Sequence, residues 1–353
     1  MESFRDAVSA AVGRSDAEPI DVVHVPLDYD AFLAHRAVGR VRGAAVVDGE
    51  RLPWSMIEKR TEGPDSASPY LRDNGLRELA AYRSRLFDDM PPGIRAPRAY
   101  GTLLEPDGAI TLWLEDVPHE GARPLDGQAM LTAARHLGEM NGRWFGRAVE
   151  PWMFEGWIDR HAQPEAVERS LELVRSAHPA VVARLGDRVA LAERLMLDQP
   201  RVREVLEALP QTLCHHDAVG ANVIRTGPAT VLIDWESVGP GTVGADLASL
   251  LFASVRRGDA SAVTVAAVLD DAVRAYTDGF RSESADVASD EIRRGFDAAV
   301  ALRWKLAADV VETIASGRPA RRGSLPDEAP GQALDELVSL VDLVLDTARR
   351  VLD

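Results

Sequence analysis

A short polar segment near residue 215 carries side chains that could perform phosphoryl transfer. His215, His216 and Asp217 follow one another, and Asn222 comes soon after them. An apolar run then leads to Asp234. In phosphoryl transfer from a nucleotide, one carboxylate orients the attacking hydroxyl and accepts its proton, while an amide oxygen and a second carboxylate hold Mg²⁺ on the phosphates. The segment therefore predicts Asp217 as the catalytic base and Asn222 and Asp234 as metal ligands.

A polar loop without catalytic function is the competing interpretation. An ordinary Asx turn would also bring Asp and Asn near a glycine, and Gly220 lies between Asp217 and Asn222. The spacing alone is therefore a moderate indication. Asp234 strengthens it, because this residue ends the apolar run Val231–Ile233, which is the context that a catalytic segment of this kind requires.

The neighbouring residues His215, His216 and Glu236 could either contact the substrate or support the loop. Adjacent residues of an extended segment point to opposite faces, so the two histidines are poorly placed to share one ion. The sequence also lacks the His and Cys spacings of zinc sites. We expect His215 to brace the loop by hydrogen bonds. For His216, a position facing the substrate and a solvated position are equally compatible with the sequence.

Two further pairs of residues are predicted to bind the nucleotide. Lys59 ends an apolar strand and Glu78 lies on the next expected helix, and an ion pair between them would direct the ammonium group at the phosphates. The alternative is an exposed lysine at a strand end. The run Leu112–Val117 ends where the composition changes, so backbone groups at Glu115 and Val117 could hydrogen-bond the edge of an adenine.

The span between the first two expected strands, residues 28–39, has no G-x-G-x-x-G pattern. A glycine loop would let backbone amides approach the phosphates closely. We therefore expect the phosphates to be covered less tightly, or to be held by His35 or Arg36.

The pattern of apolar residues predicts a β-rich first third, after a short amphipathic helix, and a helical remainder. Strands are expected at 20–25, 38–47, 52–59, 97–104 and 109–114, with one helix at 76–87. Helices are then expected at 127–145, 164–176, 187–208, 243–257, 261–281, 289–316 and 331–351, interrupted by two short strands within 212–236. This order predicts an α+β fold with two lobes, residues 1–117 and 118–353, and a cleft between them.

Composition and charge exclude several classes of protein. The chain has 353 residues, is 46% hydrophobic, and contains no apolar run long enough to span a bilayer and no signal-peptide pattern. The single Cys214 excludes an intramolecular disulfide and fits a reducing cytoplasm. A net charge of −16 argues against a nucleic-acid partner. It mildly favours a cationic substrate, although general solubility explains the charge more simply.

At this point the residues resemble a known family. The segments 215–222, 233–236 and 246–248 are similar to those of the aminoglycoside phosphotransferase and choline-kinase-like family, including phosphotransferases common in actinobacteria. The resemblance extends over about residues 22–314, with weaker matches at 54–59, 77–82 and 112–117. It implies a protein-kinase-like fold with an N-terminal antiparallel sheet, one main helix beside it and a larger helical C-terminal lobe. It also implies ATP or GTP as the donor, Mg²⁺ as the cofactor and an alcohol as the acceptor.

The resemblance carries over to individual residues, with two departures. It implies Asp217 as the catalytic base, Asn222 and Asp234 as metal ligands, and Lys59 with Glu78 as the phosphate-holding pair. The family usually has glycine or another small residue where His216 stands, and it usually has a glycine loop over the phosphates. We expect Asp246 to be structural, because an acid at the start of a helix suits capping and the helix dipole.

Three functions are compatible with these residues. The first is a kinase that phosphorylates a hydroxyl of an aminoglycoside-like, amino-sugar or other natural-product acceptor. The second is a kinase acting on Ser or Thr of a peptide natural-product precursor. The third is a nucleotide-binding protein without activity that serves as a partner of another enzyme, an interpretation that the missing glycine loop favours.

Overall fold

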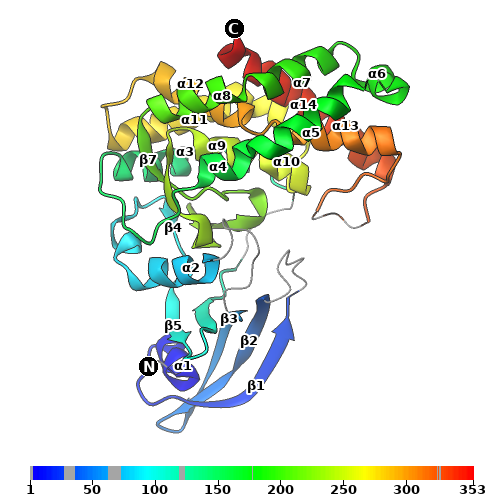
Figure 1. The fold of residues 1–353 in the computed structure, drawn as a ribbon. Helices are drawn as coiled ribbons and strands as arrows, with labels where there is room; N and C mark the ends of the chain where they lie inside the picture. Colours follow the sequence, from blue (N-terminus) through cyan, green and yellow to red (C-terminus); the bar gives the residue numbers. More distant parts are fainter. Residues whose placement is uncertain are drawn as a thin grey trace.

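The computed structural model describes residues 3–27, 36–62, 73–118, 124–176, 178–323, 325 and 327–353 (Figure 1). The fold is α+β and bilobed, with a β-sheet at one end of the molecule and most helices at the other, as the sequence predicted (Figure 1). The exact division after residue 117 stays a proposal. Among the described residues, no helix is both long and apolar enough to cross a membrane.

The sheet lobe consists of five antiparallel strands in the order β1-β2-β3-β6-β5. Their bounds are Glu18–Pro26 for β1, Arg36–Val47 for β2, Glu50–Thr61 for β3, Ala99–Leu104 for β5 and Ile110–Glu115 for β6. The two-residue turn Asp48-Gly49 has positive φ at both positions, +51° and +82°, which matches the twist of a tight hairpin. This turn sets the register that places Lys59 opposite Val38 on β2.

The two faces of the sheet are covered by different helices. Alternate residues of a strand point to opposite faces, so Trp54 and Met56 of β3 lie on the other face from Lys59. Trp54 and Met56 are buried in a cluster with α1 (Phe4–Val12). On the face of Lys59, apolar residues of β6 pack with Leu79 of α2 (Asn74–Arg83). This packing brings α2, and with it Glu78, to the side of the sheet that carries Lys59.

The helical lobe is built around a close contact between α3 and α11. The bounds of its longer helices are Gly127–Trp144 (α3), Pro164–Arg175 (α5), Arg188–Leu197 (α7), Gln199–Ala208 (α8), Ala262–Glu283 (α11), Ser289–Ala301 (α12), Lys305–Ser316 (α13) and Pro330–Leu352 (α14). A Cβ atom at Gly138 of α3 would collide with the carbonyl oxygen of Tyr276 of α11, so glycine is required at this crossing. The close approach lets Tyr276 donate a hydrogen bond to Asn141 of α3, at 2.5 Å.

Several expected helices are interrupted. The helix predicted at 187–208 ends at Leu197, and α8 begins with Pro200 in its first turn, where a residue without an N–H group is tolerated. The helix predicted at 289–316 is broken between α12 and α13, and the one at 76–87 ends at Arg83. The segment predicted at 243–257 becomes α9 (Ala245–Ala248), a π-helical stretch (249–253) and α10 (Ser254–Arg257).

The segment between α8 and α9 contains more strands than expected. It holds β7 (Gln211–Cys214), β8 (Val223–Thr226), β9 (Ala229–Leu232) and β10 (Gly239–Thr242). β10 pairs with β7, and β9 pairs with both β8 and the short β4 (Ile94–Arg95). These strands are too short to show a periodic pattern in the sequence. They hold the polar segment near residue 215 between the two lobes.

Candidate active site

The loop between β7 and β8 brings the three predicted chemical groups together. The side-chain amide of Asn222 donates hydrogen bonds to the main-chain oxygen and to Oδ2 of Asp217, each at 2.9 Å. The N–H of Ile233 donates to the main-chain oxygen of Asn222 at 3.1 Å, which places Asp234 beside this loop. Asp217 and Asp234 both line one cavity of about 470 Å³. Both carboxylates and the Asn222 amide are thus gathered at one place.

The environment of Asp217 suits a proton acceptor. Burial raises the pKa of Asp217, and the charge of Asp234 raises that pKa further. A carboxylate with a raised pKa is a stronger base and takes a proton from a hydroxyl more readily. The raised pKa is thus in keeping with the predicted role of Asp217 as a proton acceptor.

His215 supports the loop from beneath. Its ring is fully buried and packs edge to face on Trp235. The N–H of Asp217 donates to Nδ1 of His215 at 3.3 Å, so Nε2 carries the proton that it donates to the carbonyl oxygen of Ile233 at 3.1 Å. These two bonds connect the residues on either side of the site. The arrangement matches the loop support that the sequence indicated.

His216 is held away from the cavity. Its ring stacks on Trp157 at 5.2 Å, and Nε2 donates to the carbonyl oxygen of Pro240 at 3.0 Å. The ring is not among the residues lining the cavity, and burial lowers its pKa to about 4, so it is neutral at pH 7. Of the expected roles, these contacts match loop support rather than substrate contact. The backbone of His216 has a φ of +63°, a conformation that glycine adopts without strain.

Asp246 anchors the loop through its carboxylate. It accepts hydrogen bonds from the N–H of His215 at 2.9 Å, from the N–H of His216 at 2.8 Å and from the side-chain amide of Asn141 at 3.2 Å. The expected structural role is therefore present, but the expected capping bond is not, since α9 has no side-chain cap. The carboxylate is fully buried. It stabilises the loop from a helix about thirty residues further along the chain.

Replacing Asp246 should destabilise the protein. Asp246→Ala would leave the two loop N–H groups and the Asn141 amide buried without an acceptor, at a cost of about 3 kcal/mol. Asp246→Asn keeps one acceptor oxygen and should cost less. Urea unfolding followed by circular dichroism measures both losses. Asp278→Ala, at an exposed position of α11, is the control and should change stability by less than about 0.5 kcal/mol. Equal stability of Asp246→Ala and Asp278→Ala would contradict the anchoring role.

Lys59 lies in a buried cluster of carboxylates. Its Nζ is 2.6 Å from Oε2 of Glu78, contacts Oδ1 of Asp234, and is 3.9 Å from Oε2 of Glu236. The expected ion pair with Glu78 is therefore present, and the Lys59 side chain is only 9% exposed, unlike a solvated strand end. Burial lowers the pKa of Lys59, but Asp234 and Glu78 more than compensate and hold that pKa well above its usual value. The ammonium group is charged and contacts Asp234, which lines the cavity.

Glu236 connects the sheet lobe to the segment after Asp234. Its carboxylate pairs with Arg36 of β2 and accepts from Nδ2 of Asn74 at 2.6 Å, and its main-chain oxygen accepts from Nε of Arg77 at 2.9 Å. Burial, followed by the charge of Asp234, raises the pKa of Glu236 to about 7. Of the two residues expected near the phosphates, Arg36 is thus held by Glu236, and His35 lies outside the described residues.

The oxygen ligands fit Mg²⁺. The Asn222 amide nitrogen is used in bonds to Asp217, which leaves its carbonyl oxygen available, and Asp234 offers a carboxylate beside it. Mg²⁺ prefers such hard oxygen ligands and is usually held by one or two carboxylates together with substrate phosphates. Glu78, Asp234 and Glu236 also bring carboxylate oxygens within 4.8 Å of one another. Asp234 thus belongs to both candidate groups of oxygen ligands, and Asn222 with Asp234 stays the predicted ligand pair.

The segment expected to bind adenine offers one free donor. Glu115 is engaged on both sides, because its N–H donates to the carbonyl oxygen of Arg98 at 2.8 Å and its carboxylate accepts from Arg95 at 2.6 Å. Within the described part of the chain, the N–H of Val117 has no hydrogen-bond partner. Val117 is also buried. The N–H of Glu115 is thus engaged, and a contact between Val117 and adenine stays a prediction.

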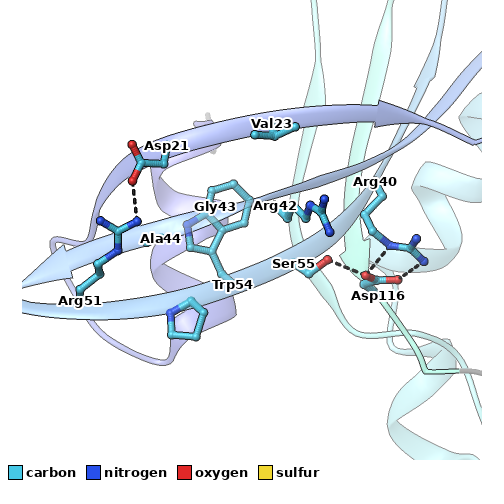
Figure 2. Close-up of a pocket in the computed structure, with 11 residues that line it drawn as sticks. Asp21, Val23, Arg40, Arg42, Gly43, Ala44, Arg51, Trp54, Ser55 and Asp116 are labelled. Atoms are coloured by element: carbon cyan, nitrogen blue, oxygen red, sulfur yellow. Dashed lines mark hydrogen bonds and ion pairs between the residues drawn. The ribbon is translucent and has the colours of Figure 1, made fainter.

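A second hollow is larger but lacks these chemical groups. It measures about 870 Å³ and lies on β1, β2 and β3 (Figure 2). Figure 2 shows Arg40 donating to Asp116 at 2.7 and 3.0 Å, with Ser55 donating to the same carboxylate. None of the predicted catalytic or metal-binding residues lines this hollow. Size alone would therefore select the wrong site, and the smaller cavity at Asp217 is the candidate active site.

Sequence reasoning missed part of the smaller cavity. Basic side chains from α4 (Trp157–Ala162), α10, the turn after α12 and α13 line it on the helical side. The sequence does show basic residues close together at two places. Arg256 and Arg257 end one helix, and Arg303 and Lys305 lie at a break between two helices. Nothing in the sequence indicated that these segments meet.

Comparisons with known proteins identify a family and a fold. A family model described as "Phosphotransferase enzyme family" matches residues 34–285. No curated protein matches the chain. Three similar solved structures are an aminoglycoside phosphotransferase from Alicyclobacillus acidocaldarius, an amicoumacin kinase in complex with AMP-PNP and Ca²⁺, and a choline kinase from Cryptosporidium parvum.

The likeness to these structures lies in the fold. The aminoglycoside phosphotransferase has a TM-score of 0.51 at 15% identity, over 88% of this chain and 90% of its own. The amicoumacin kinase has a TM-score of 0.50 at 15% identity, over 93% of this chain and 89% of its own. The choline kinase has a TM-score of 0.51 at 11% identity, over 93% of this chain and 89% of its own. The kinase-like fold that the sequence predicted is confirmed.

Proposed function

The chain belongs to the phosphotransferase enzyme family, and from this premise we propose that it transfers the γ-phosphoryl group of ATP to a hydroxyl group of a small molecule. The observation that carries the proposal is the meeting of Asp217, Asn222 and Asp234 in one cavity, with Lys59 of the sheet lobe paired to Glu78 beside them. The names of the similar amicoumacin and choline kinases support a small-molecule acceptor.

Each residue has a role in the proposed transfer. Lys59, oriented by Glu78, binds the α- and β-phosphates. Asp217 hydrogen-bonds the acceptor hydroxyl and accepts its proton as the oxygen forms a bond to the γ-phosphorus. The bond between the γ-phosphorus and the bridging oxygen breaks at the same time, and ADP leaves. Phosphoryl transfer depends mainly on this positioning and on stabilisation of charge.

Asn222 and Asp234 would hold Mg²⁺, which when bound neutralises charge on the phosphates. Val117 would donate its N–H to the adenine. His215 and Asp246 do not touch the reacting atoms in this proposal. They keep Asp217 in place through hydrogen bonds to the loop backbone.

The proposal predicts nucleotide consumption that depends on an acceptor. The purified chain should be incubated with Mg²⁺, ATP or GTP, and a panel of hydroxyl compounds that includes aminoglycosides, amino sugars, neutral sugars and sugar acids. We expect one class to raise nucleoside diphosphate release well above the rate without acceptor, and mass spectrometry should detect the phosphorylated product. Tight binding of MgATP by titration calorimetry without turnover on any acceptor would contradict the proposal and favour the non-catalytic partner protein. The peptide acceptor stays an untested prediction.

A further inference from the structure

The helical side of the catalytic cavity is basic. Its cationic residues come from four separate segments that surround the space next to Asp217: α4, α10, the turn after α12 and the first residue of α13. These residues are Arg160, Arg256, Arg257, Arg303 and Lys305. Apart from Asp217 itself, the acidic residue lining this side is Asp309 of α13. The cavity wall therefore carries more positive than negative charge.

Three of these cations have only neutral partners. Among the described residues, Arg160 donates to Oγ of Ser237 at 3.2 Å, Arg303 to Oγ of Ser249 at 3.0 Å, and Lys305 to Oε1 of Gln163 at 2.9 Å. None of the three forms a salt bridge with a described acid.

The remaining two cations have distant acidic partners. Arg256 is 3.7 Å from Asp309, and Arg257 is 3.8 Å from Asp259. Among the described residues, Arg160, Arg303 and Lys305 form no salt bridge, and the longer-range charges of Asp217, Asp246 and Asp309 act on them.

Arg303 is the least satisfied of the three. Its Nε atom is buried and has no hydrogen-bond partner. Burial lowers the pKa of Arg303 to about 10, so the side chain still carries its charge at pH 7. A buried guanidinium with an unused N–H is costly unless an acceptor satisfies it. Carboxylate and phosphate groups are the acceptors that a guanidinium binds best, because their oxygens match its planar donors.

The position of these cations points to the acceptor rather than to the nucleotide. Lys59 and Arg36, the basic residues near the expected phosphates, come from the sheet lobe and are paired with acids. Arg160 and Arg303 come from the helical lobe and interact electrostatically with Asp217, the proposed base. A group bound to Arg303 and Lys305 would thus lie against the helical lobe, whereas Lys59 belongs to the sheet lobe.

The local charge is opposite to the charge of the whole protein. The net charge of −16 mildly favoured a cationic substrate, but surface charges are screened beyond about 8 Å at physiological salt. Within the cavity, contact with Arg160, Arg303 and Lys305 determines which ligand is favoured. A cationic ligand would meet three positive side chains there that have no salt-bridge partner among the described residues.

We propose that the acceptor is an anion: a hydroxyl compound whose carboxylate or phosphate group binds Arg303 and Lys305, with Arg160 beside them, while its hydroxyl faces Asp217. The inference rests on the proposed phosphotransferase function and names the chemical class of its acceptor. Binding of the acid group would satisfy Nε of Arg303 and neutralise the basic wall. It would also fix the hydroxyl at a set distance from the base.

The first test needs no turnover. Thermal unfolding is measured in sodium sulfate and in sodium chloride at equal ionic strength, for the wild type, Arg303→Gln, Lys305→Gln and the control Arg318→Gln. Arg318 is exposed and paired with Glu312, outside the cavity. We expect sulfate to raise the Tm of the wild type and of Arg318→Gln more than chloride does, because a ligand that binds only the folded state stabilises it. The excess should shrink in Arg303→Gln and Lys305→Gln to the general stabilisation that sulfate gives any folded protein. An equal response of all four proteins would overturn the proposal.

The second test compares sugar compounds that share one ring and differ in charge. Glucose, glucosamine, glucuronate and glucose 6-phosphate are compared as acceptors and as competitors of any acceptor that the general panel identifies. We expect the anionic compounds to bind best, and glucuronate against glucose 6-phosphate shows whether carboxylate or phosphate is preferred. Arg303→Gln should raise the KM for the acceptor by about tenfold to a hundredfold, the range for a lost charged hydrogen bond, with a smaller change in kcat. The affinity for MgATP, measured by calorimetry, should not change.

The two proposals can fail separately. Turnover with amino sugars and none with anionic compounds would overturn the anionic acceptor while leaving the phosphotransferase intact. A loss of MgATP affinity in Arg303→Gln would also overturn it, because the basic residues would then serve the nucleotide. Selective stabilisation by sulfate without any turnover would support the anion site and count against the phosphotransferase.

Discussion

Asp217→Asn should lower kcat by roughly a thousandfold, the usual contribution of a positioned proton acceptor, while MgATP binding changes little. The amide cannot accept the proton, but it has the size and shape of the carboxylate and can keep one hydrogen bond to Asn222. Acceptor-dependent ADP release gives kcat, and titration calorimetry gives the affinity for MgATP. If the rate of Asp217→Asn is reduced to the same extent when the acceptor is saturating, the variant is impaired in the chemical step rather than in acceptor binding.

Asp259→Asn is a suitable control for this variant. Asp259 accepts a hydrogen bond from the N–H of Ala221 at 3.0 Å, so it supports the same loop, but it does not line the cavity. We expect its activity to stay within a few fold of the wild type. Full activity of Asp217→Asn would reject Asp217 as the base.

The pH dependence offers a second measurement of the same role. A base works only when deprotonated, so activity should be lost as pH falls through the pKa of Asp217. Burial and the charge of Asp234 raise that pKa above the ordinary value of aspartate. The acidic limb of the rate profile should therefore lie above the usual aspartate range, and Asp217→Asn should remove it from the residual activity.

Lys59→Met is expected to have the second largest effect and to change both activity and stability. Without the ammonium group, the phosphates lose a positive partner, and kcat/KM for ATP should fall by about a hundredfold or more. The buried carboxylates of Glu78, Asp234 and Glu236 would also lose the cation that contacts them all. Breaking a buried ion pair in this way typically costs about 3 kcal/mol or more.

The loss of stability in Lys59→Met should depend on pH. The charge of Lys59 lowers the pKa values of Asp234 and Glu236 in the folded state, so its removal should raise both. For an acid with a raised folded pKa, stability is lost as pH rises from the unfolded value toward the folded one. Urea unfolding at pH 5 and pH 8 should therefore show the larger deficit at pH 8. Arg60→Met, at the exposed neighbouring position of β3, is the control. A deficit independent of pH would contradict this account.

Features encoded by neighbouring residues could be predicted from the sequence. The strands and helices followed from the period of their apolar residues, and the Lys59–Glu78 pair followed from a strand end and the next helix. The loop with Asp217 and Asn222 could be recognised because its residues lie close together in the chain. Asp234 follows this loop after one short apolar run, so it could be assigned to the same site.

Features made by distant segments could not be predicted. Asp246 accepts bonds from His215 and from Asn141, which lie in different elements, and no local pattern indicates such partners. The position of His216 depends on Trp157 and Pro240 in the same way. The net charge is an average over the surface and says little about one cavity. The basic wall arises because several helix ends meet, which is a property of the tertiary fold.

The distribution of charge makes the cleft electrically asymmetric along its length. At one end, Lys59 and Arg36 are paired with the carboxylates of Glu78, Asp234 and Glu236, so the positive charges there are compensated. At the other end, positive side chains are in excess. The two ends of the cleft therefore present different charges to a ligand, and the second attracts an acid group more strongly than the first.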